Sequence, residues 1–442
     1  MTAEPVTVPS TSGPEPTSSP STVVADPRAT RRRMISGALI LVVGIVTIVG
    51  WGLGANRGQA AFAVSSGQDT VHIPVIRIPG GTAAIVLGAV VVLLGLWQLA
   101  RGFSRTALRW VIGVTILLFA LAFLCWAATG QAGTPIDLLG ALQLSIFAAT
   151  PLILGALAGI VCERSGVINV AIEGQLLAGA FAGALAASVA HSLGLGILVA
   201  ALAGALIGAL LAVFAIRYAV NQVVLGVVIN LLVLGLTGYL YHALMQEDSQ
   251  TYNSPGVLSP IRIPGLADIP ILGPLLFDAN ILVYVMYVLI VVVDIGLFRT
   301  RWGLRTRAVG EHPRAADTVG INVRRIRYRN VLIGGLIAGL GGAFLTIGAV
   351  GSFSANISSG KGFIALAAVI FGRWSPRGAV AAALLFGFTN ELQVLLTVVG
   401  TPVHIPSAFL SMLPYVATLF AVAGLVGKVS APAADGVPYT KE

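Results

Sequence analysis

The residues of this chain that could act on another molecule are polar groups set inside long apolar runs. The carboxylates of this kind are Glu173, Asp294 and Glu391, and the amides include Asn169, Asn221 and Asn390. A charged residue at the centre of a membrane-spanning helix costs roughly 2.5–3.5 kcal/mol, so such residues face a cavity or another helix. Amides both donate and accept hydrogen bonds, which suits a hydroxylated or heterocyclic solute in a partly dry cavity.

Each of these polar residues also has a structural interpretation. Glu173 lies near the start of a helix, where it either caps backbone amides at a helix break or contacts a solute. Asp294 lies within one turn of Arg299, and we expect it to pair or to reach the membrane edge. The pair Asn390-Glu391 either faces a cavity or forms hydrogen bonds between helices.

The predicted solute path combines these residues with one aromatic side chain. Lys361 and Phe363 open a short apolar segment, 363–372, which is too short to cross a bilayer alone. Broken helices near the middle of the membrane are where transporters present backbone and amide groups to a solute. We therefore predict that the translocation pathway is lined by Asn169, Glu173, Asn221, Phe363 and Asn390.

No arrangement of residues in the sequence indicates an enzyme. The five histidines are scattered without a G-x-S-x-G motif, and the two cysteines lack metal-ligand spacing. A G-x-x-x-x-G-K-[ST] phosphate-binding loop is missing from the sequence. We expect a transport subunit without its own ATPase site, catalytic residues, metal or cofactor. The energy for uphill transport would enter from an ion gradient or from a partner protein.

The composition is that of a membrane protein. Of 442 residues, 57% are hydrophobic and 10% are charged, the mean hydropathy is +0.93, and 53 glycines lie within apolar runs. Small residues allow membrane helices to pack closely. The fold class that we predict is an all-α polytopic bundle of 11–12 spans, counting the half-span. The other spans are 34–54, 81–100, 107–129, 139–161, 166–190, 193–216, 221–243, 280–298, 331–351, 378–400 and 407–427.

The arginines give these spans one consistent orientation. Most of the formal charge of +9 lies at the ends of apolar runs, which favours orientation and contact with anionic headgroups over nucleic-acid binding. With Arg31 to Arg33 inside, the basic residues of 101–109, 299–329 and 373–377 all fall inside, and the acidic loop 244–279 falls outside. The sequence predicts a multi-pass protein of the cell membrane with cytoplasmic N- and C-termini.

The segment 299–329 is a long polar stretch between two spans, with nine arginines against Glu311 and Asp317. Pro313 suits the first helical position and Gly320 the position just past a helix end, so 313–319 is predicted to form a short helix. With small residues at 315 and 316, this helix would be exposed and another protein could bind closely against it.

The chain divides into parts of different character. Residues 1–33 are rich in Pro, Ser and Thr, and we predict a disordered cytoplasmic tail. Residues 34–130 hold three spans almost without intramembrane polar groups, and we predict an accessory extension. We predict a working core over 135–430, containing the cytoplasmic loop 299–330, and a cytoplasmic tail over 431–442.

Several segments resemble a known family. GLRTRAVGEHPRAADTVGINVRRIRY (303–328) resembles the cytoplasmic coupling loop, or EAA loop, of ATP-binding-cassette (ABC) importer permeases. SGVINVAIEGQLLAGAFAGA (165–184) resembles the hallmark segment of the branched-chain amino acid and ribose permease superfamily. GKGFIALAAVIFGRWSPRGA (360–379) and GVPYTKE (436–442) resemble the nucleoside-type, simple-sugar-related permeases. The resemblance covers 135–442 and leaves the first spans as an addition.

The resemblance implies an importer permease for nucleosides, with simple sugars next. It implies three partners: a cytoplasmic ATP-binding subunit, a second homologous permease and an extracellular solute-binding lipoprotein. Coupling to the ATPase would involve Glu311, His312, Pro313, Arg314, Ala315, Ala316 and Gly320. The order Glu-His-Pro-Arg-Ala-Ala departs from the E-A-A order of the loop's name. The alternative is a secondary transporter driven by an ion gradient, with Glu173 and Glu391 as its midplane carboxylates.

Overall fold

The structure is a computed structural model that describes residues 27–53, 58–65, 73–129, 135–399, 406–410, 412–413 and 430–440. Within these ranges ten helices are long and apolar enough to cross a membrane. The predicted all-α polytopic bundle is therefore confirmed. Most of the predicted span 407–427, and residues 1–26 of the predicted disordered tail, lie outside the described residues.

The chain separates into two compact units, of which the smaller comprises 1–54 and 84–123. It contains helix α1 (Pro27–Val46), the π-helical turn η1 (Thr47–Leu53), and most of α2 (Gly80–Ala100) and α3 (Arg105–Ala128). The ring of Trp51 packs edge-on against Phe123 at 5.1 Å between centroids, and Gln98 Nε2 donates to Ser36 Oγ at 2.9 Å. Because α1 begins at Pro27, the end of the predicted disordered tail is helical.

The larger unit comprises 55–83 and 124–442, and its described residues include two small sheets. Strand β1 (Gln59–Ala63) pairs antiparallel with β2 (Ile76–Pro79) and parallel with β3 (Ile136–Asp137). Strand β4 (Ile261–Arg262) pairs antiparallel with β5 (Asp278–Ala279). These strands lie between helices and were not predicted from the sequence.

The other regular elements described in the larger unit are helices. The long helices are α4 (Leu138–Glu163), α5 (Ile172–Ala190), α6 (Leu193–Ala212), α7 (Gln222–Leu240), α10 (Ile281–Arg299), α13 (Val323–Leu345) and α15 (Pro376–Val399). The shorter helices are α8 (Ser249–Tyr252), α9 (Leu272–Phe277), α11 (Arg301–Glu311), α12 (Pro313–Thr318), α14 (Lys361–Phe371) and α16 (Ser407–Leu410). The π-helical turns η2 (Val213–Arg217), η3 (Tyr241–Met245) and η4 (Thr346–Val350) extend α6, α7 and α13.

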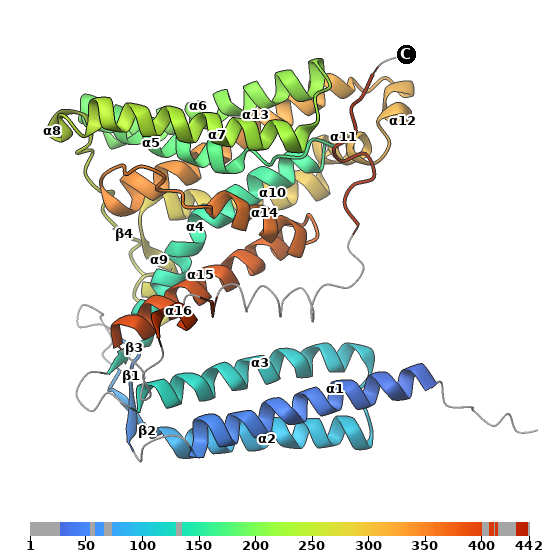
Figure 1. Cartoon of the computed structure of the whole chain (residues 1–442), viewed down its shortest axis with the longest axis vertical. Helices are drawn as coiled ribbons and strands as arrows, with labels where there is room; N and C mark the ends of the chain where they lie inside the picture. The colour runs from blue at the N-terminus through green and yellow to red at the C-terminus, as the bar shows by residue number, and fades with distance from the viewer. Residues whose placement is uncertain are drawn as a thin grey trace, which may run out of the picture. The chain divides into compact units, whose positions relative to one another are not determined.

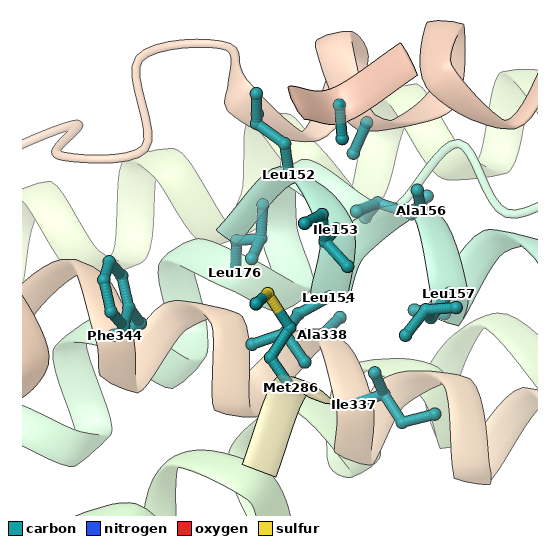
Figure 2. Close-up of a cluster of buried hydrophobic side chains, with 14 of the residues drawn as sticks. Leu152, Ile153, Leu154, Ala156, Leu157, Leu176, Met286, Ile337, Ala338 and Phe344 are labelled. Carbon is teal, nitrogen blue, oxygen red and sulfur yellow. The ribbon is translucent and has the colours of Figure 1, made fainter. Parts of the chain in front are cut away.

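Helix α13 is the centre of this unit. It packs against α4, α5 and α6, which lie beside it in Figure 1. Figure 2 shows the apolar core where Leu154 and Leu157 of α4 meet Ile337 of α13, and all three side chains are buried. Helix α6 approaches α13 so closely that a Cβ atom on Gly335 would lie 2.5 Å from the carbonyl oxygen of Gly204. Glycine is needed at this crossing because a side chain would separate the two backbones.

Two of the predicted membrane-spanning elements of this unit are shortened or interrupted. The predicted span 166–190 is only partly helical, because α4 ends at Glu163 and α5 begins at Ile172. The segment between these helices, 164–171, is called the break segment below. Helix α14 has 11 residues, so it matches the predicted half-span and cannot cross a bilayer of about 30 Å alone.

Candidate functional site

Amide side chains of helix α7 stabilise the break segment. The backbone amide of Ile168 donates to Gln222 Oε1 at 2.7 Å. Asn230 Nδ2 donates to the carbonyl of Val170 at 2.9 Å, and Asn230 Oδ1 accepts from the amide of Gly174 at 2.8 Å. Irregular backbone within a membrane needs such partners, since no lipid atom can replace them. No pattern in the sequence indicated these roles for Gln222 and Asn230.

Glu173 joins the start of α5 to the start of α14. Its carboxylate accepts hydrogen bonds from Ser358 Oγ at 2.6 Å, from the Gly360 amide at 2.8 Å and from the Gly362 amide at 2.6 Å. A Cβ atom on Gly362 would lie 2.5 Å from Cα of Glu173, so only glycine permits this approach. The positive end of α14 favours the carboxylate here. Of the two predicted roles of Glu173, capping backbone amides is the one that these contacts describe.

Asn169 lies inside the protein at the break segment. Its side chain is fully buried, and Nδ2 donates to Gln175 Oε1 at 3.0 Å. Asn169 Oδ1 and Gln175 Nε2 are buried and have no hydrogen-bond partner among the described residues. Buried polar atoms are rarely left unpaired. Asn169 of the break segment and Gln175 of α5 therefore form a polar pair whose hydrogen-bonding capacity is only partly used.

The other predicted path residues are more exposed. Phe363 lies on α14, one residue after Gly362, and is 48% exposed. Asn390 is exposed on α15. Asn221 caps α7, and its Oδ1 accepts from the amides of Val223 and Val224 at 3.0 and 3.2 Å. The contacts of the described residues bring Glu173 to the start of α14, close to Phe363 in the chain, but place Asn390 and Asn221 on separate helices.

Asp294 pairs with an arginine that is distant in the sequence. Its Oδ2 accepts from Arg377 Nε at 3.1 Å and Nη2 at 2.8 Å, which ties α10 to the start of α15. Arg299 lies nearer in sequence, but no ion pair joins it to Asp294 in the described structure. Arg299 is the arginine that the sequence places near Asp294. Arg377 becomes its partner because α15 packs against α10.

The polar loop 299–330 contains two helices. The predicted short helix is confirmed as α12 (Pro313–Thr318), and Gly320 follows it at φ +83°. Helix α11 (Arg301–Glu311) precedes α12 and was not predicted.

The residues of this loop that were predicted to meet an ATPase differ in exposure. Exposed side chains belong to Glu311, His312, Arg314 and Ala315, and Gly320 is also exposed, whereas Pro313 is half-buried. Ala316 is instead buried, packed with Val309 and Val323. The exposure predicted for the Ala315-Ala316 pair therefore holds for Ala315 alone, because the opposite face of α12 needs contacts with α11 and α13.

Sequence reasoning missed a buried arginine beneath this loop. Arg327 of α13 is 1% exposed, and its Nε donates to the carbonyl of Ser165 in the break segment at 3.2 Å. Its Nη1 donates to the carbonyl of Val437 near the C-terminus at 2.9 Å. Nothing in the sequence distinguishes Arg327 from the other eight arginines of the cluster.

Burial also changes the acidity of groups around Arg327. Burial and the nearby carboxylate of Glu163 raise the pKa of Asp435 to about 8, although Arg327 and Arg164 act in the opposite direction. Burial lowers the pKa of Arg164, partly against the attraction of Glu311. Ionisable groups are therefore buried together where the break segment, α11 and the C-terminal residues meet.

Comparison with known proteins places this architecture in a family. Residues 141–423 match the family described as the permease component of the branched-chain amino acid transport system. The guanosine ABC transporter permease protein NupQ of Bacillus subtilis (strain 168) is 42% identical over 66% of this chain and 94% of its own length. The nucleoside ABC transporter permease protein NupC of Lactococcus lactis subsp. cremoris is 39% identical over the same shares.

More distant relatives carry other names. The putative glucose ABC transporter permease protein TsgC13 of Haloferax volcanii is 35% identical over 58% of this chain and 77% of its own length. No solved structure gives a significant match. None of these relatives supports the ion-gradient-driven alternative. The chain thus belongs to the branched-chain amino acid transport system permease family of ABC transporters, and it is a multi-pass membrane transport component.

Proposed function

We propose that this chain is the translocation subunit of an ATP-driven importer of nucleosides. The observation that carries the proposal is its identity of 42% with a guanosine permease along 94% of that protein. Simple sugars are the second candidate class, because a putative glucose permease matches less closely and over a smaller share.

The remaining parts of the importer are proposed on the same basis. A cytoplasmic ATPase subunit docks on the exposed face of α12, a second homologous permease completes the pathway, and a solute-binding lipoprotein delivers solute from outside. This chain has no ATPase site of its own. Both termini are cytoplasmic, in agreement with the arginine distribution. Residues 34–130 form an accessory bundle, 135–430 the permease core with its coupling loop at 299–330, and 431–442 a cytoplasmic tail.

We place the solute path along the break segment and α14. Asn169, Glu173 and Phe363 contribute from there, and Asn221 and Asn390 contribute from α7 and α15. A nucleoside offers a flat base for an aromatic face and ribose hydroxyls for amides or carboxylates.

Reconstitution tests this function. The chain, its partner permease and the ATPase subunit are placed in proteoliposomes with the solute-binding protein, and uptake of labelled guanosine is followed. We expect uptake that requires ATP and persists when proton and sodium gradients are collapsed. Uptake that follows an ion gradient without ATP would refute the proposal, and uptake of glucose but not guanosine would move it to the sugar class.

A further inference from the structure

The described C-terminal residues, 430–440, lie against α11 and α12 (Figure 1). We call this segment the tail. The backbone amide of Ala434 donates to the carbonyl of Gly310 at 2.8 Å, and the amide of Ala433 donates to Glu311 Oε2 at 3.1 Å. Both acceptors belong to the last residues of α11. The tail is thus hydrogen-bonded to the helix that leads directly into α12.

The same tail reaches the break segment through one side chain. Arg327 donates to Val437 of the tail and to Ser165 of the break segment. Gly166 has φ +84°, and a Cβ atom there would lie 2.7 Å from Arg327 Nη2 and 2.9 Å from the carbonyl oxygen of Ala434. The tail, the guanidinium and the break segment therefore fit together with no space for another side-chain atom.

The end of the tail lies beside α12. Tyr439 packs against the buried cluster formed by Val309, Ala316 and Val323. It also lines a cavity of about 370 Å³ together with Asp317 and Gly320 at the end of α12. A side chain of the tail therefore completes the support beneath the face of α12 opposite to exposed Ala315.

We infer that the tail is a strap that transmits movement of α12 to the break segment, with Arg327 as its positioning residue. The inference rests on the proposed function, in which α12 receives force from an ATPase. Helix α12 has six residues, and isolated helices shorter than about 12–15 residues are marginal. Such a helix needs surrounding contacts to move as a rigid part. The strap supplies these contacts to α12. It also reaches the break segment, whose backbone is not helical.

Two variants and one matched control test the strap in the complete importer. The first variant ends the chain after Val429 and so removes the whole tail. The second, Arg327→Lys, keeps the charge but loses the forked geometry that reaches both carbonyls. The control is Arg217→Lys, the same change at an exposed arginine outside the coupling loop. Uptake and ATP hydrolysis are measured in the same proteoliposomes, together with thermal unfolding and co-purification of the ATPase.

We expect both variants to retain the ATPase subunit and to hydrolyse ATP, while uptake per ATP falls by about fivefold or more, as for a typical coupling between sites. The control should match the wild type. An unchanged uptake per ATP in both variants would refute the strap. If the unfolding temperature also falls, the contacts of the tail serve stability instead. Failure of the proposed function is a separate result, since the wild type itself would then show no ATP-dependent uptake.

Discussion

The carboxylate of Glu173 at the start of α5 accepts a hydrogen bond of 2.6 Å from the backbone amide of Gly362 at the start of α14. Each of these helices begins after an interruption, and each start supplies what the other lacks. The backbone amides at the start of α14 lack partners within that helix. The carboxylate of Glu173 needs hydrogen-bond donors because this residue is only 8% exposed. The two interrupted elements therefore fix one another and form a single unit.

Replacing Glu173 with Gln should destabilise this unit. The amide side chain keeps one acceptor oxygen but turns an NH₂ group toward backbone donors, so at least one charge-assisted hydrogen bond is lost. Each such bond contributes about 1.5–3 kcal/mol. We expect a lower unfolding temperature in detergent and reduced uptake. The exposed variant Glu247→Gln is the control, and an unchanged unfolding temperature for Glu173→Gln would contradict the capping role.

Asn390 and Asn230 should respond differently to replacement by Ala. Asn390 is exposed on α15, so Asn390→Ala should lower uptake with little change in stability if it lines the path. Asn230 is buried and bonds to Val170 and Gly174, so Asn230→Ala should cost about 1–3 kcal/mol by leaving backbone groups unpaired. Thermal unfolding and uptake per folded complex separate the two effects. A stability loss with unchanged uptake per complex would make Asn390 structural.

The two faces of α12 should also separate in mutants. Ala315 is exposed, so Ala315→Leu should leave folding intact but reduce solute-stimulated ATP hydrolysis and uptake. Ala316 is 3% exposed, and Ala316→Leu should cost about 1–3 kcal/mol through overpacking. Membrane insertion, unfolding temperature and stimulated hydrolysis are the measurements. Normal stimulated hydrolysis and uptake in Ala315→Leu would argue against docking at this face.

The ion pair between Asp294 and Arg377 should contribute little to stability. The side chain of Arg377 is 76% exposed and that of Asp294 is 16% exposed, so water screens much of the attraction. A double-mutant cycle with Asp294→Asn and Arg377→Ala should give a coupling energy of about 0–1 kcal/mol. A value several times larger would mean that the pair is shielded from water in the assembled importer.

Docking of the tail should weaken as pH rises. The pKa of Asp435 is raised to about 8 in the docked tail by burial and by Glu163, against Arg327 and Arg164. The docked state therefore binds more protons than the free state, so its stability falls between the ordinary carboxyl range and pH 8 and levels off above it. A spin label at Thr440 should become more mobile over this range. Asp435→Asn should flatten that response, whereas an unchanged profile would assign it to another group.

The sequence alone determined the membrane architecture and the half-span α14 in outline, but not the break between α4 and α5. Spans are long apolar runs, and a run of about 20 residues is set by bilayer thickness without reference to neighbours. Pro313 and Gly320 predicted the two ends of α12 for an equally local reason. Proline restricts its own backbone and glycine permits backbone angles that other residues avoid. The short run after Lys361 indicated α14 by length alone.

Tertiary structure decided which polar groups meet. The sequence could not show that Asn230, 56 positions from Gly174, would bind its amide, or that Arg377 would pair with Asp294. It could not single out Arg327 among nine arginines, because charge orients a loop regardless of which arginine turns inward. Contacts between residues far apart in the chain depend on how helices cross, and glycines such as Gly204 and Gly335 set those crossings only when both helices are present.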